Sequence, residues 1–145
     1  MLISDVLHQK GTDVVKVVAT ASVASAVQKL AERRIGAVIV EDQWMKLVGI
    51  FSERDLLNAI ARQGHHALDL PVKELMTTHL ITCRPADRVD AALALMTTRR
   101  IRHLPVVDEG GALRGMVSIG DLVKYRLDEK ELEANTLREI SRMRA

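Results

Sequence analysis

Two short segments of this 145-residue chain combine residue types that could bind a ligand. Each reads Gly-φ-φ-Ser-x-x-Asp, where φ is an apolar residue, and they occupy Gly49–Asp55 and Gly115–Asp121. A serine followed three residues later by an acid is typical of a helix N-terminus, where it satisfies free backbone N–H groups. Such a terminus also attracts ligand oxygens, and a carboxylate can accept bonds from two ligand hydroxyls. The motif therefore indicates helix capping, ligand binding, or both together.

The two motifs belong to an internal duplication. Residues 33–56 align with residues 99–122 without a gap, beginning with Arg-Arg-Ile in both copies. Further upstream, Val72–Met76 repeats the pattern of Ile3–Leu7, with three additional loop residues in the first copy. A unit of about 60 residues buries too little surface to be stable by itself. We therefore expect the two copies to pack into one body with a pseudo-twofold axis.

Periodicity predicts the same order of elements in each copy: helix, strand, helix, strand, strand, helix. In the first copy these are Leu2–Leu7, Val14–Ala19, a helix from Val23 capped by Ser22, Ala37–Val40, Leu47–Phe51 and Asp55–Gln63. In the second copy they are a helix opened by Pro71, Leu80–Cys83, a helix from Val89, Leu104–Val107, Leu113–Val117 and a helix from Asp121. The predicted fold class is α/β (α+β), with a small three-stranded sheet and flanking helices in each copy.

Three segments follow from this pattern: repeat 1 at residues 1–66, repeat 2 at residues 67–127, and a charged tail at residues 128–145. The tail is predicted to be helical because Leu132, Leu137, Ile140 and Met143 form a partial apolar stripe. We expect it to pack on a partner or to fray in solvent.

Composition narrows the function classes. The formal charge is +2 and one cysteine is present, which suits a reducing compartment, and we expect a cytoplasmic protein with no membrane association. With three aromatic residues, the chain lacks the stacking platforms of single-strand nucleic-acid binders. No nucleophile–base pair is visible, so an enzyme is not expected, and neither is a catalytic cofactor. His65-His66 has no third metal ligand at suitable spacing, and Cys83 is interpreted as a buried hydrophobe.

The duplicated motif, together with Arg102-His103-Leu104-Pro105-Val106-Val107-Asp108, resembles a tandem pair of cystathionine-β-synthase (CBS) domains, or Bateman module. The resemblance covers the chain except for its tail. The chain is similar to the small stand-alone bacterial members of that family. The resemblance implies pseudo-twofold related CBS repeats whose clefts bind adenosine-containing ligands.

The resemblance also implies which residues would bind. Asp55 and Asp121 would hold ribose, Ser52 and Ser118 would contact ribose or phosphate, and basic residues would hold phosphate. By the family pattern one site combines Ser52, Arg54, Asp55, Ile81, Thr82, Arg102 and His103. The other combines Ser118 and Asp121 with Lys16, Gly36 and Ala37. Because Gly36-Ala37 stands where the second copy has Arg102-His103, we expect the sites to differ, with weaker phosphate contacts beside Asp121.

The function implied is a regulatory module that binds AMP, or ADP, ATP or NAD(H), and acts on an unidentified partner protein. The resemblance further implies a flat homodimer formed through helices with apolar faces, such as Leu56, Leu57 and Ile60. Two other hypotheses remain open at this point. One is a homodimeric interaction module whose clefts stay empty, and the other, less favoured, is a nucleic-acid binder.

Overall fold

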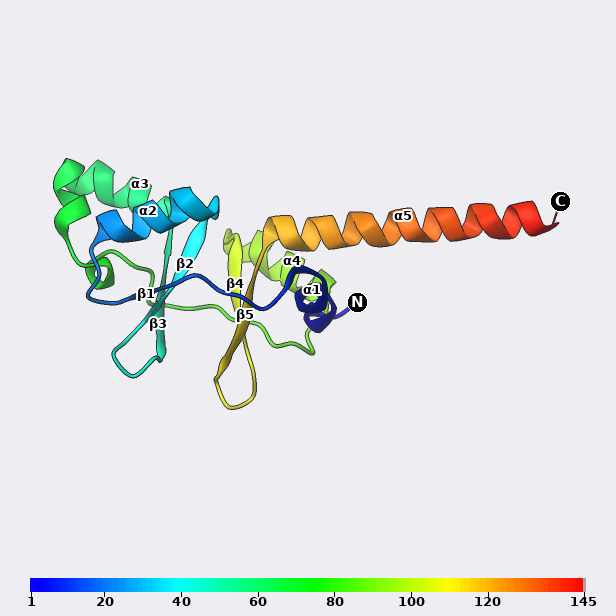
Figure 1. The fold of residues 1–145 in the computed structure, drawn as a ribbon, viewed down its shortest axis with the longest axis horizontal. Coiled ribbons are helices and arrows are strands. Elements are labelled where there is room, and N and C mark those ends of the chain that lie inside the picture. The colour runs from blue at the N-terminus through cyan, green and yellow to red at the C-terminus, as the bar shows by residue number, and fades with distance from the viewer. Residues whose placement is uncertain (145) are drawn as a thin grey trace. The chain divides into compact units, whose positions relative to one another are not determined.

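The computed structural model describes residues Met1–Arg144 and divides into two compact units (Figure 1). The middle unit is Asp13–Ile81. The terminal unit joins Met1–Thr12 to the chain from Thr82 onward. None of the described helices combines the length and the apolar character that crossing a membrane requires.

The middle unit is built on a three-stranded sheet in the order β1-β2-β3. Its strands are β1 (Lys16–Val18), β2 (Ala37–Glu41) and β3 (Leu47–Ser52), with β1 parallel and β3 antiparallel to β2. The helices are α2 (Val23–Arg33) and α3 (Glu53–Gln63), followed by the 3₁₀ helices η1 (Gly64–Asp69) and η2 (Val72–Glu74). Aliphatic side chains from sheet and helices surround Phe51, which is fully buried.

The terminal unit repeats this plan with fewer strands. Its elements are α1 (Ile3–Lys10), α4 (Val89–Arg99), β4 (His103–Val107), β5 (Leu113–Ser118) and α5 (Ile119–Arg144). Strands β4 and β5 pair antiparallel, and the expected third strand is reduced to one parallel bridge between Cys83 and Val106. The prediction of a strand over Leu80–Cys83 and of three full strands in this repeat is therefore corrected.

Two prolines explain the shortened sheet. In the middle unit the Ile39 N–H donates to Val15 O (3.0 Å) and the Ala19 N–H donates to Glu41 O (2.8 Å). The residues 66 positions later than these two donors are Pro105 and Pro85, which have no N–H to donate. Only the two bonds around Cys83 survive, from Cys83 N to Pro105 O (3.0 Å) and from Val107 N to Cys83 O (2.9 Å).

The compact units do not coincide with the sequence repeats. The first segment of each repeat lies in the unit that is formed mainly by the other repeat. Helix α1 opens the chain but lies in the terminal unit, where Ile3 N donates to Asp87 O (2.8 Å). Residues 72–77 open the second repeat but lie in the middle unit, where Val72 N donates to Ala21 O (2.7 Å). The repeat boundaries at residues 66 and 67 therefore describe the sequence, whereas the tertiary units are interleaved along the chain.

The charged tail is not a separate helix. Helix α5 begins directly after β5 and runs without a break through Arg144, so it includes the segment from residue 128 that the sequence analysis set apart as a tail. Two other predictions also change. Pro71 precedes a single 3₁₀ turn instead of an α-helix, and α1 extends to Lys10. The last residue of the predicted tail segment, Ala145, lies outside the described residues.

Both motif glycines provide room for a neighbouring segment. A Cβ atom at Gly49 would lie 2.9 Å from Met76 Cγ and 3.0 Å from the Thr77 carbonyl oxygen. A Cβ atom at Gly115 would lie 2.8 Å from Leu7 Cδ2. Met76 and Leu7 occupy equivalent positions in the duplicated pattern, so the same close approach recurs in both units.

We expect Gly49→Ala to lower the free energy of unfolding by about 1–3 kcal/mol, as overpacking does. The Thr77 backbone cannot move away easily because it exchanges two hydrogen bonds with Ile50, at 2.8 and 3.0 Å. Gly115→Ala should cost less, since only the end of the Leu7 side chain must shift. Gly110→Ala, where the new Cβ would lie 3.4 Å from Asp108 Oδ1, is the control. Urea unfolding midpoints would measure all three, and equal midpoints for Gly49→Ala and Gly110→Ala would contradict this packing argument.

Candidate functional site

The first motif caps α3 through reciprocal hydrogen bonds. The Ser52 N–H donates to Asp55 Oδ2 (2.9 Å), and the Asp55 N–H donates to Ser52 Oγ (3.3 Å). The Ser52 hydroxyl also donates to Asp55 Oδ2 (3.1 Å). This is the capping box that the serine–acid spacing predicts. It fixes a half-buried carboxylate at the N-terminus of a helix, directly after a buried strand.

A residue outside the motif completes the surroundings of Asp55. The Thr77 hydroxyl donates to Asp55 Oδ1 at 2.9 Å. Thr77 reaches this position because its backbone pairs with Ile50 of β3, as an isolated antiparallel bridge. The sequence analysis did not identify Thr77. Its position directly after the duplicated Val72–Met76 segment was the available signal.

The second motif forms the same cap with a charged partner. The Ser118 N–H donates to Asp121 Oδ2 (2.8 Å) and the Asp121 N–H donates to Ser118 Oγ (3.1 Å). The Lys10 ammonium donates to Asp121 Oδ2 at 2.6 Å and to Met116 O at 2.8 Å. Lys10 lies at the end of α1 and was also missed by the sequence analysis, because 111 residues separate it from Asp121.

The ion pair sets the charge of Asp121. Burial raises the pKa of this carboxyl, but hydrogen bonds from Lys10 and Ser118 and the Lys10 charge lower it by more. The pKa therefore lies below its ordinary value of 3.8. A lowered pKa in the folded state means that the ionised form contributes stability at neutral pH, and this contribution is lost as the pH falls through the lowered pKa.

The two carboxylates keep different acceptor capacity. Each oxygen of a carboxylate can accept about two hydrogen bonds. In Asp55, Oδ2 accepts from Ser52 and Oδ1 accepts from Thr77. In Asp121, Oδ2 accepts from Ser118 and Lys10, whereas Oδ1 accepts no hydrogen bond from the residues of the described chain. Asp121 Oδ1 thus has the greater capacity for ligand hydroxyls.

Strand register places other predicted residues beside these caps. In the middle unit Ala37 pairs with Ser52, and the Glu53 N–H donates to Gly36 O (3.0 Å). In the terminal unit His103 pairs with Ser118, and the Ile119 N–H donates to Arg102 O (2.9 Å). Register thus brings Gly36 and Ala37 to the first cap, and Arg102 and His103 to the second. The grouping that the family resemblance implies instead places Arg102 and His103 with the first cap, and Gly36 and Ala37 with the second. That grouping stays a prediction.

The remaining predicted residues lie on several elements. Lys16 on β1 forms an ion pair with the buried Glu41, with Nζ 2.9 Å from Oε1. Arg54 is exposed in the first turn of α3. Ile81 is half-buried and Thr82 is exposed, in the irregular segment directly before the Cys83 bridge. The ammonium of Lys16 is therefore paired with Glu41. The backbone carbonyl of Lys16 accepts a separate hydrogen bond from Lys29 Nζ (2.9 Å).

Other reactive groups offer no further centre. Within residues 1–144 no three His, Cys, Asp or Glu side chains are placed to hold a metal ion. His65 and His66 lie in η1. Cys83 is buried, as predicted, and burial together with the nearby Asp87 charge raises the pKa of its thiol to about 12. Such a thiol is protonated at neutral pH and is a poor nucleophile.

Comparison with known proteins gives several matches. The CBS-domain family model matches residues 3–62 and 72–128. The mitochondrial CBS domain-containing protein CBSX3 of Arabidopsis thaliana is 36% identical over 143 residues, which are 93% of this chain and 69% of that protein. The chain spans between 20% and 63% of the lengths of seven further curated relatives.

Solved structures agree with the sequence matches. The CBS-domain protein ATU1752 of Agrobacterium tumefaciens is 42% identical, with a TM-score of 0.83 over 86% of this chain and 92% of its own. The protein PAE2072 of Pyrobaculum aerophilum, complexed with AMP, is 30% identical, with a TM-score of 0.74 over 83% and 89%. The CBS pair of protein MJ0100, in complex with 5′-methylthioadenosine and S-adenosyl-L-methionine, is 25% identical, with a TM-score of 0.78 over 89% and 98%. The duplicated caps, the interleaved units and these matches together establish that the chain belongs to the CBS-domain family, as a tandem pair.

Proposed function

We propose that this chain is a regulatory module that binds adenosine-containing ligands, with AMP as the first candidate and ADP, ATP or NAD(H) as the others. The observation that carries the proposal is the pair of capped carboxylates, Asp55 and Asp121, each held in one orientation by its own serine. Relatives of the same family were solved with AMP and with S-adenosyl-L-methionine. What these ligands share is the adenosine group, which carries a ribose diol.

A ribose diol suits these carboxylates because it offers two hydroxyl donors to an acceptor that is already oriented. The capping bonds fix the side chain before the ligand arrives, so less conformational entropy is lost on binding. Asp121 Oδ1 can accept both hydroxyls directly. Asp55 Oδ1 can accept one hydroxyl alongside Thr77, or two if the Thr77 hydroxyl turns away.

The phosphate would be held by basic side chains. Arg102 is exposed at the start of β4 and can form bidentate bonds to a phosphate, and His103 follows it. Arg54 adds positive charge at the N-terminus of α3, where the helix dipole also favours an anion. Ile81, Thr82, Gly36, Ala37 and the Lys16 strand are proposed to line the binding sites, as the family pattern implies.

Regulation is proposed to act through a partner protein, because the family resemblance implies a regulatory role for such a module. A ligand-free interaction module is the competing function. The two are separated by thermal unfolding with and without AMP, since a ligand that binds only the folded state raises the melting temperature. No shift with AMP, ADP, ATP, NAD(H) or S-adenosyl-L-methionine would favour the ligand-free module.

We also propose a homodimer that uses the exposed side of α3. Leu57 and Ile60 are 69% and 38% exposed and lie three residues apart, so they share one side of the helix. The half-buried Leu56 extends this apolar surface toward the core. A second copy could cover these side chains.

The first prediction tests the ribose role of Asp55. Asp55→Ala removes hydrogen bonds to a charged group, which are worth roughly 1.5–3 kcal/mol, so AMP affinity should fall about 10- to 150-fold. The fold should also weaken by about 0.5–2 kcal/mol because the cap of α3 is lost. Titration calorimetry well below the melting temperature separates the two effects.

Asp5→Ala is the matched control for this experiment. Asp5 accepts from the Leu2 N–H (2.9 Å) at the start of α1, so its removal also deletes a helix cap. It should lower stability and leave AMP affinity unchanged. If Asp55→Ala behaves like Asp5→Ala, with normal AMP binding in a weakened fold, then Asp55 is only a cap.

A second prediction separates phosphate from ribose. Arg102→Ala should weaken AMP about 10-fold or more through the loss of a charge-assisted contact, while the affinity for adenosine stays the same. Arg99→Ala, at the exposed end of α4, is the control. Combining Arg102→Ala with Asp55→Ala or with Asp121→Ala in double-mutant cycles shows which carboxylate shares its ligand with Arg102. An equal loss for AMP and adenosine would refute the phosphate role.

A third prediction concerns the dimer. Leu57→Glu with Ile60→Glu should lower the mass of the assembly at micromolar concentration, because burying unpaired charges is costly. Sedimentation measures the change, with Asn58→Glu, on the adjacent exposed surface of α3, as the control. A mass of 16.1 kDa for the unmodified chain would refute the dimer.

A further inference from the structure

The last part of α5 has no neighbours in the described chain. The helix contacts α1 and α4 near its start, and Arg126 forms an ion pair with Asp90 of α4. From Lys130 to Arg144 every side chain is exposed, and the helix continues past α1 and α4 (Figure 1). At 1.5 Å per residue this free segment is about 22 Å long. A helix of this length is marginal in water without a packing partner.

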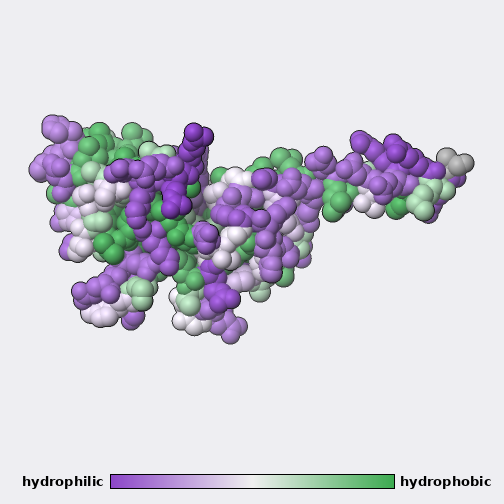
Figure 2. Space-filling view, in the orientation of Figure 1, coloured by the Kyte–Doolittle hydropathy of each residue, from purple (hydrophilic) through white to green (hydrophobic). Residues whose placement is uncertain are grey.

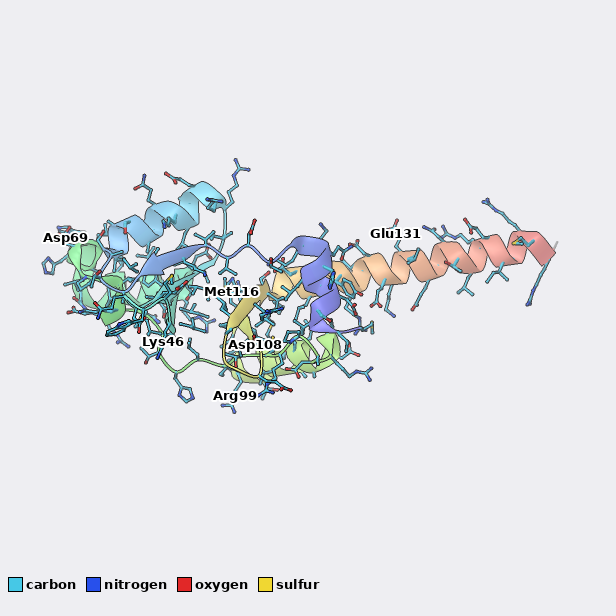
Figure 3. The ribbon with its side chains drawn as sticks, turned by 60° about the horizontal axis from the view of Figure 1, so that its bottom comes forward. Lys46, Asp69, Arg99, Asp108, Met116 and Glu131 are labelled. Carbon is cyan, nitrogen blue, oxygen red and sulfur yellow. The ribbon has the colours of Figure 1, made fainter. Side chains whose placement is uncertain are left out.

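One side of the free segment is apolar. Leu132, Thr136, Ile140 and Met143 follow one another at intervals of four, four and three residues, which places them on one side of a helix. We call these four residues the tail stripe. Leu132, Ile140 and Met143 are 68%, 42% and 86% exposed. In Figure 2 apolar surface interrupts the hydrophilic surface of α5, and in Figure 3 the side chains near Glu131 point away from the ribbon on all sides.

The charges of the segment are separated along its length. Residues 128–133 contain four acids and one lysine, a net charge of −3. Residues 138–144 contain three arginines and one glutamate, a net charge of +2. The helix dipole accounts for basic residues in the last turn only, and the acidic group begins more than two turns after the start of α5. A second helix with the opposite charge order would match this segment.

A second copy of the same chain provides that order when it runs antiparallel. We propose that the tail stripe pairs with the tail stripe of a second copy in an antiparallel helical pair centred near Thr136. Leu132 then faces Ile140 of the second copy, and the acidic residues 128–133 lie beside the basic residues 139–144. A parallel pair would place acidic beside acidic and basic beside basic, which repels. This contact is separate from the α3 surface and does not depend on nucleotide binding.

Disulfide trapping of full-length chains tests both the contact and its direction. Cys83 does not interfere, because it is buried and its thiol pKa is about 12. Thr136→Cys should cross-link to itself in mild oxidant, since two residues at the centre of an antiparallel pair face each other. Met143→Cys alone should not cross-link, because the two positions would be about 21 Å apart. Mixed Glu129→Cys and Met143→Cys chains should cross-link.

A matched pair of variants tests whether the tail stripe is the surface involved. In the Thr136→Cys chain, adding Ile140→Asp should abolish the cross-link, because it places a charge in the centre of the stripe. Ala134→Asp introduces the same charge two residues from both Leu132 and Thr136, on the opposite side of the helix, and should leave the cross-link intact. Sedimentation should show a lower mass for Ile140→Asp than for Ala134→Asp.

Three results would overturn the proposal. Self-cross-linking of Met143→Cys would show a parallel pair. An absence of cross-linking by Thr136→Cys would show that the tails do not meet. Equal behaviour of Ile140→Asp and Ala134→Asp would show that the contact, if formed, does not use the tail stripe.

Discussion

The hydrogen bonds between a serine and an acid three residues later are the constraint on which each unit depends. A strand ends and a helix begins with no loop between them, at Ser52 and again at Ser118. Such a junction leaves helix N–H groups without intrahelical partners beside a buried strand. The serine and aspartate satisfy their own N–H groups, and the carbonyls of Gly36 and Arg102 accept from the first N–H of each helix. The same bonds hold a half-buried carboxylate at the start of the helix, and this carboxylate is the group that the proposed binding uses.

The two strand–helix junctions share the same capping hydrogen bonds, but different side chains contact the two carboxylates. Asp55 receives a neutral hydroxyl from Thr77, whereas Asp121 receives the Lys10 ammonium. Thr77 and Lys10 each lie in the segment that opens a repeat. Each of these segments lies in the compact unit that is formed mainly by the other repeat. Gly49 and Gly115 permit this close approach because they have no side chain. The interleaving of the two copies therefore decides which group faces each carboxylate, and so gives two similar sites different acceptor capacity and charge.

The same duplication shows how few residues alter an element. Pro85 and Pro105 stand where the middle unit has two backbone donors, and their effect is to reduce a three-stranded sheet to a hairpin with one bridge. The loss is local, since the hairpin β4–β5 keeps the register of β2–β3, including an irregularity before its last pair. The site geometry at Ser118 is therefore preserved although the sheet around it is smaller.

The sequence by itself determined the duplication, the order of elements in the first copy, the capping role of both serine–acid pairs and the burial of Cys83. These follow from local spacing and from apolar periodicity, which act between residues close together along the chain. It also contained the reason for the missing strand, because proline cannot donate wherever it stands. Only the tertiary structure decided that Thr77 and Lys10 reach the two carboxylates. These contacts join separate segments of the chain, and the bond of Lys10 spans 111 residues. Local patterns contain no information on which distant segment will fill a given space.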